Sequence, residues 1–172
     1  MPITPDSKNW TWVLDEPCPE CGYDAARFDA GEVGAETRRN VEAWPAVLLR
    51  ADVARRPDGD TWSPLEYAAH VRDVFRIMRR RLALILDEDD PLFDNWDQDA
   101  TAVAERYNEQ NAATVSHELV AAGLVIADAF DAVPADAWQR TGRRSDGARF
   151  TTETLGKYFL HDPVHHLHDV TH

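Results

Sequence analysis

Four stretches of this chain place apolar residues three and four positions apart, and this spacing limits the possible folds more than any other feature. The stretches cover residues 29–56, 64–87, 114–132 and 152–172. Such spacing puts apolar side chains on one face of an α-helix, where they pack against other helices. The sequence therefore predicts an all-α fold, a bundle of four principal helices.

The second of these helices has the clearest start signal. Ser63 is placed as its N-cap, Pro64 fits the first helical position, and Glu66 completes a capping box with Ser63. A long polar connection, with a short helix around residues 99–107, separates this helix from a third one capped by Thr114. The bundle should thus have a long crossover between its second and third main helices.

Turn-forming and helix-breaking residues add local expectations. Asp146-Gly147 predicts a hairpin just before the last helix. Pro45 and Pro163 each fall inside a predicted helix, where the missing N–H favours a kink.

Charge and length exclude several classes of protein. A chain of 172 residues is long enough to bury a core as one domain without disulfides. Its net charge of −13 repels phosphate backbones and anionic lipids, so we expect neither a nucleic acid nor a membrane as partner. The chain has no run of apolar residues long enough for a membrane span, and its start does not resemble a signal peptide. These features predict a cytoplasmic protein.

The first 28 residues lack helical periodicity and form a predicted irregular extension before a helical bundle at residues 29–172. Within the extension, Cys18 and Cys21 stand in a Pro-Cys-Pro-Glu-Cys-Gly sequence that is typical of a zinc knuckle. A tetrahedral site needs two more ligands, which histidines or a second subunit can supply. A redox pair and a plain turn with two ordinary thiols are the alternatives.

The C-terminal stretch is rich in histidine. On a helix, one narrow face would carry His161, His165, His168 and His172. His166 would point elsewhere, and Asp162 and Asp169 would lie away from this face. His70 lies on the apolar face of the second helix, so it should meet the last helix inside the bundle. Three imidazoles around one divalent ion leave coordination positions open, which is typical of a catalytic site.

Two sequence motifs resemble those of the DinB-like superfamily. Residues Trp62–Val71 are similar to its "WS…E…aH" motif, and Leu160–His166 are similar to its "HD.vHH" motif. The resemblance covers roughly residues 30–170. It implies a four-helix bundle, a frequent homodimer, and a divalent metal ion, zinc or nickel, bound by His70, His161 and His165.

The resemblance also implies a function, because several members of this superfamily are transferases or isomerases that use low-molecular-weight thiols of the mycothiol type. We expect a metal-activated thiol to attack a small electrophile, with Arg143, Arg144 or Arg149 holding the polar end of the thiol. Glu66 and His168 are candidates for proton transfer. The alternatives are a metal-dependent hydrolase and a non-catalytic, metal-binding dimeric scaffold.

Overall fold

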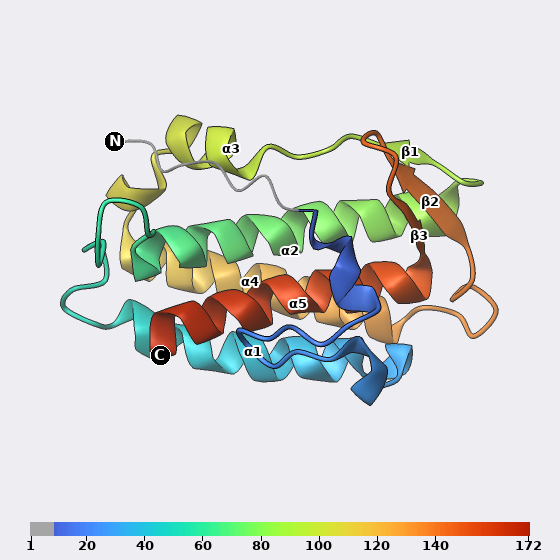
Figure 1. Ribbon diagram of the computed structural model, residues 1–172, viewed down its shortest axis with the longest axis horizontal. Coiled ribbons are helices and arrows are strands. Elements are labelled where there is room, and N and C mark those ends of the chain that lie inside the picture. Colours follow the sequence, from blue (N-terminus) through green and yellow to red (C-terminus); the bar gives the residue numbers. More distant parts are fainter. Residues whose placement is uncertain (1–8) are drawn as a thin grey trace.

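The structure, a computed structural model, describes residues 9–172. Four long helices lie side by side, as Figure 1 shows: α1 (Val33–Leu48), α2 (Pro64–Asp87), α4 (Ala112–Asp131) and α5 (Thr152–Thr171). The predicted four-helix bundle is confirmed.

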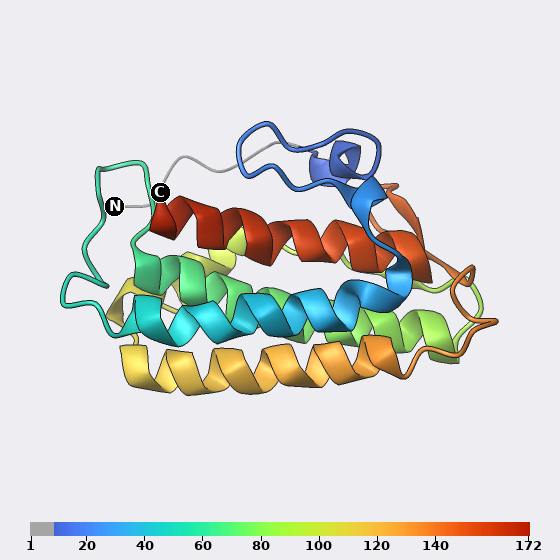
Figure 2. The same cartoon turned by 90° about the horizontal axis from the view of Figure 1, so that it is seen from below.

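The order of the helices around the bundle differs from their order in the chain. Helix α4 packs against both α1 and α2, and α5 packs against the same two helices, so α1 and α2 occupy opposite corners. Helices α2 and α4 run in the same direction, because the long crossover returns the chain to the other end of the molecule (Figures 1 and 2). The centre is filled by large buried side chains, among them Trp44, Phe75, Leu119, Phe130 and Phe159.

The helix boundaries follow local chemistry. Ser63 Oγ accepts from the backbone N–H of Glu66, and the Glu66 carboxylate accepts from the backbone N–H of Ser63, which is the predicted capping box. Helix α4 begins earlier than predicted, because Asn111 rather than Thr114 is its N-cap. Helix α1 ends at Leu48, earlier than the predicted end near residue 56, and turns occupy the residues that follow.

The fold is mostly helical, as predicted, but it also contains a small three-stranded sheet. Strand β1 (Leu92–Phe93) pairs in parallel with β2 (Thr141–Arg144), which pairs antiparallel with β3 (Arg149–Thr151) across the predicted hairpin. Strand β1 lies in the long crossover, which also contains α3 (Gln98–Ala104). A strand of two residues whose partner is distant in sequence has no periodic signal of its own.

Helices α1 and α5 both continue through their internal prolines, Pro45 and Pro163. The side chain of Asn40 on α1 donates from Nδ2 to the backbone carbonyl of Pro163 over 2.8 Å. Trp44 Nε1 in turn donates to Asn40 Oδ1. This buried chain of hydrogen bonds joins α1 to α5 near the middle of the histidine-rich stretch.

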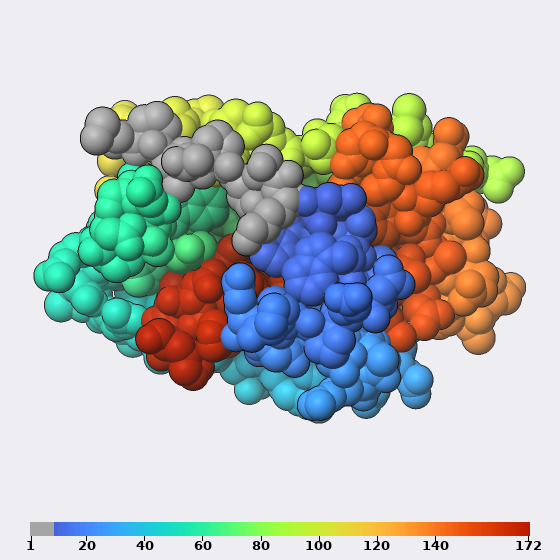
Figure 3. Space-filling model, viewed as in Figure 1, coloured from blue at the N-terminus to red at the C-terminus, as the bar shows by residue number. Residues whose placement is uncertain are grey.

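The N-terminal segment, residues 9–28, lies against α5. It contains the short 3₁₀ helices η1 (Trp10–Leu14) and η2 (Ala25–Arg27), and η3 (Ala30–Glu32) leads into α1. Figures 2 and 3 show this segment along α5, beside the β2–β3 hairpin. A second small core forms beneath it, consisting of Cys18, Tyr23, Ala25 and Leu160.

Helix α4 is long and apolar enough to cross a membrane by length and composition alone. Its residues Val115, Leu119, Ile126 and Phe130 are buried in the bundle, so in this fold α4 is a core helix.

Candidate metal centre

Helix α5 presents metal-binding side chains on two adjacent faces. His161 and His165 are four residues apart, and so are Asp162 and His166. Consecutive residues of an α-helix point about 100° apart, so the two pairs face different parts of the protein. Asp162 and His166 face α2, whereas His161 and His165 face the N-terminal segment.

The first group joins α2 to α5 through His70, Asp162 and His166, which offer one donor atom each within 4.8 Å of one another. His70 Nε2 lies 3.3 Å from each of the two carboxylate oxygens of Asp162. His166 Nε2 lies 3.9 Å from Asp162 Oδ1. These side chains therefore converge on one small volume between the helices.

Aromatic rings fix the position of His70. Its ring is fully buried, stacks on Trp96 at a centroid distance of 5.3 Å, and contacts Trp62. His70 Nδ1 and Asp162 Oδ1 are buried without a hydrogen-bond partner among the residues that the structure describes. The Nε2 atoms of His70 and His166 and the carboxylate of Asp162, with its unsatisfied Oδ1, form a donor set that fits a divalent ion.

Charge in this group also suits a cation. Burial raises the pKa of Asp162, but the attraction of its carboxylate to His70 and His166 outweighs this effect and holds the pKa at about 2. Asp162 is therefore ionised at neutral pH. His166 Nδ1 lies 3.0 Å from Asp169 Oδ2, and donation of its proton there leaves the Nε2 lone pair directed toward Asp162.

A cavity of about 750 Å³ adjoins this group. Asp162 and His166 line it directly, together with His161 and His165 on the same helix. Its other walls include residues of α2, α3, the β2–β3 hairpin and the N-terminal segment. Among these wall residues are Tyr67, Arg81, Trp96, Arg144 and Tyr158. Asp162 and His166 thus face a space that can hold a small molecule.

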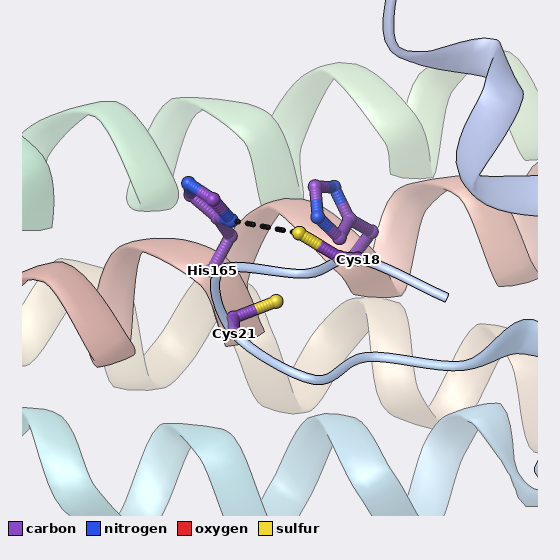
Figure 4. Close-up of side chains that lie close together, drawn as sticks. Cys18, Cys21 and His165 are labelled. Atoms are coloured by element: carbon purple, nitrogen blue, oxygen red, sulfur yellow. Dashed lines mark hydrogen bonds between the residues drawn. The ribbon is translucent and has the colours of Figure 1, made fainter. Parts of the chain in front are cut away.

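The second group joins α5 to the N-terminal segment. Its members are Cys18, Cys21, His161 and His165, again with donor atoms within 4.8 Å of one another. Cys18 Sγ lies 3.6 Å from His165 Nδ1, and Figure 4 shows both thiols on the loop that faces α5. Burial lowers the pKa of His161 to about 4 and raises the pKa of Cys21 to about 11.

The three ligands suggested by the sequence are divided between these groups. His70 lies with Asp162 and His166, whereas His161 and His165 lie with the two cysteines. Asp162 and His166 lie away from the His161–His165 face, as expected, but it is their face, and not that of His161 and His165, that meets His70. Because the N-terminal segment covers the His161–His165 face, the neighbouring face of α5 meets α2.

The proton-transfer candidates lie outside both groups. The Glu66 carboxylate is buried and accepts hydrogen bonds from Arg56 and Ser63. The ring of His168 stacks on His172 at a centroid distance of 4.4 Å. Glu66 therefore has a structural role at the start of α2, and His168 lies at the end of α5.

Of the three arginines on the hairpin, Arg144 alone lines the cavity. Arg144 donates to Asp146 and to the hydroxyl of Tyr158. Arg143 pairs with Asp90, with 2.9 Å between Nε and Oδ2, and Arg149 is exposed.

The fold and the first group define a helical-bundle protein with a candidate metal centre between α2 and α5. The family model of the DinB superfamily matches residues 34–170, and the chain belongs to this superfamily. Among solved structures, the chain is similar to YfiT from Bacillus subtilis, described as a probable metal-dependent hydrolase with an unusual four-helix bundle topology. The two share 18% identity at a TM-score of 0.62, over 96% of this chain and 89% of YfiT. A search of curated proteins found no match.

Proposed function

We propose that this protein is a metal-dependent enzyme whose ion is held by His70, Asp162 and His166. The observation that carries the proposal is the convergence of these three side chains, two of which, Asp162 and His166, line a cavity of about 750 Å³. Three protein donors leave at least one coordination position for a substrate or water, and a cavity of this size suits a small molecule.

Each of the three side chains has a defined part. His70 is held by Trp62 and Trp96, so its Nε2 stays directed at α5. Asp162 supplies negative charge that offsets part of the charge of an ion. Asp169 orients His166 through Nδ1. The mixed nitrogen and oxygen donors suit zinc or nickel.

A divalent ion in this position supplies a positive charge that lowers the pKa of a bound thiol or water molecule. Our leading candidate for the nucleophile is a low-molecular-weight thiol that attacks a small electrophile. Support comes from the cationic side chains in the cavity, Arg81 and Arg144, which can pair with a carboxylate of the thiol. Burial and the neighbouring Arg144 lower the pKa of Arg81 to about 10, so both remain cationic at neutral pH.

The second candidate reaction is hydrolysis. Its support is the similarity of the fold to YfiT, which is described as a probable metal-dependent hydrolase. In that case water takes the place of the thiol as nucleophile, and the substrate is an ester or amide that fits the same cavity.

The test uses untagged protein loaded with zinc or nickel and two sets of substrates. One set pairs thiols such as mycothiol, bacillithiol or glutathione with electrophiles, and the other contains small esters and amides. His70→Ala and Asp162→Ala should abolish the activity and lower the metal content, whereas His168→Ala serves as a matched control from the same helix. Activity that survives in both variants would contradict the proposal, and the active substrate set decides between thiol and water.

A further inference from the structure

We propose that the protein also holds a second, structural zinc ion, bound by four side chains from two distant parts of the chain: Cys18, Cys21, His161 and His165. This group shares no residue with the proposed active site, although His161 and His165 line the same cavity, and it does not depend on the proposed function. It fastens the N-terminal segment, residues 9–28, onto α5.

The distances fit tetrahedral zinc. With Zn–S bonds of about 2.3 Å and Zn–N bonds of about 2.0–2.1 Å, a sulfur and a nitrogen on one ion lie about 3.6 Å apart. Cys18 Sγ and His165 Nδ1 are 3.6 Å apart before any ion is considered. All four donor atoms lie within 4.8 Å of one another, so little movement is needed to close the site.

The backbone already forms the turn that such a site needs. The Cys18 N–H donates to the carbonyl of Tyr23 over 2.8 Å, and the Gly22 N–H donates to the carbonyl of Cys18 over 2.9 Å. Gly22 has a φ of +74°, which favours glycine. This closed turn presents both thiols to α5 (Figure 4). The spacing of two residues between the cysteines and three between the histidines is that of Cys₂His₂ zinc sites.

Burial and charge support the same assignment. Cys18, His161 and His165 are only 2%, 4% and 7% exposed. His161 Nε2 is buried without a hydrogen-bond partner among the residues described, which is unfavourable unless a ligand uses it. On binding, each thiol loses its proton to solvent, and two thiolates neutralise the charge of Zn²⁺. A neutral site is one that a protein interior can hold.

A further contact has the form expected around a zinc-bound histidine. While His165 Nδ1 faces Cys18, its Nε2 lies 3.2 Å from the Glu20 carboxylate. A carboxylate on the outer nitrogen of a histidine fixes its tautomer and strengthens it as a ligand. Glu20 comes from the same turn as the two cysteines, so the turn supplies both thiols and this supporting carboxylate.

The role that follows is mechanical. Four protein donors leave no open position, so this ion is structural. The segment that it fastens contributes Trp10 and Glu20 to the wall of the cavity beside Asp162 and His166. Zinc at this site therefore holds one wall of the proposed active site in place.

Cobalt substitution separates this site from the first group. Thiolate bound to Co²⁺ gives a charge-transfer absorption in the near ultraviolet, and the His70–Asp162–His166 group contains no sulfur. We expect untagged, full-length protein, kept under a reductant, to develop this absorption as Co²⁺ is added, with an endpoint of one thiolate-bound ion per chain. Added Zn²⁺ should displace it.

Four variants complete the experiment. The double variant Cys18→Ser/Cys21→Ser and, separately, His161→Ala should lose the tetrahedral cobalt spectrum and one equivalent of zinc. His70→Ala should keep the cobalt spectrum and the zinc of this site while it loses the ion of the first group, and His168→Ala should keep both ions. The absence of the absorption in the wild-type protein, or its persistence in the double cysteine variant, would overturn the proposal. The wild-type spectrum alone can contradict the proposal, so the test holds even if a variant fails to fold.

Discussion

His70 on α2 and Asp162 on α5 meet with 3.3 Å between the imidazole Nε2 and each carboxylate oxygen. This contact establishes which face of α5 is turned toward α2. It also places a carboxylate, rather than a third histidine, opposite His70. The proposed active site therefore depends on Asp162 as much as on the histidines around it.

Replacement of Asp162 by Asn tests this dependence. The amide keeps the size of the side chain but loses the negative charge, so we expect the affinity of the first group for zinc to fall about 10-fold or more. Competition titration against a chelating dye measures the change. His168→Ala should leave the affinity unaltered, and the thiolate–cobalt absorption should persist in Asp162→Asn. An unchanged zinc affinity would show that Asp162 is not a ligand.

Removal of zinc from the second group should loosen the N-terminal segment. Arg27 has an 81% exposed side chain at the end of this segment and offers a site for trypsin. We expect a strong chelator to speed cleavage after Arg27 at least about 10-fold, because proteolysis follows the population of locally opened chain. Mass spectrometry of timed digests measures the rate.

The double variant Cys18→Ser/Cys21→Ser should be cleaved rapidly at Arg27 even without the chelator. His172→Ala, at the exposed end of α5, serves as the control and should behave as the wild type does. Equal cleavage rates with and without metal would contradict a fastening role for the ion.

Glu66→Gln should lower stability without loss of metal. Glu66 is 3% exposed, and its carboxylate accepts from Arg56 Nε at 2.9 Å and from the Ser63 N–H at 2.8 Å. Loss of these charge-assisted hydrogen bonds should reduce the free energy of unfolding by about 2 kcal/mol. Urea unfolding gives this number, and metal analysis gives the second readout. A stable but inactive Glu66→Gln protein would instead indicate a catalytic role.

The same carboxylate predicts a pH dependence. Burial raises the pKa of Glu66, but the hydrogen bonds from Arg56 and Ser63 together lower it by more. The pKa therefore falls below its ordinary 4.5. The ionised form therefore stabilises the fold above pH 4.5, and this contribution is lost as the pH falls through the lowered pKa. Urea unfolding at a series of acidic pH values should show a shallower loss of stability for Glu66→Gln than for the wild type.

Gly123→Ala should disturb the packing of α4. A Cβ atom at this position would lie 2.3 Å from Val41 Cγ2 and 2.9 Å from Phe75 Cε2, on α1 and α2 respectively. Overpacking of this kind costs about 1–3 kcal/mol. Thermal unfolding should show the loss, whereas Gly31→Ala, where a Cβ atom meets nothing within 4 Å, should unfold as the wild type does.

The sequence predicted the bundle because helical periodicity and capping are local signals. The capping box of Ser63 and Glu66 marks the start of α2. The polar stretch between α2 and α4 has no such periodicity, and this predicts the long crossover. The hairpin of β2 and β3 was predicted, but β1 escaped prediction because it contains two residues whose partners lie some fifty positions away. Its existence depends on tertiary contacts alone.

The division of the site could be predicted only in part. The sequence showed that His161 and His165 share a face of the last helix and that His70 points inward. It did not show which face of that helix meets α2, because this depends on how the N-terminal segment folds over α5. The signal that was available is the four-residue spacing of Asp162 and His166, which matches that of His161 and His165.

The interleaved pairs on α5 restrict how this helix can change. Any rotation of α5 about its axis that improves the approach of Asp162 and His166 to α2 moves His161 and His165 away from the cysteine turn by the same angle. Insertion of one residue before this stretch would turn His161 and His165 onto the face that meets α2 and would move Asp162 and His166 off it. If both groups bind metal, selection on either one also preserves the other, and the register of this helix should vary less among related chains than its packing alone requires.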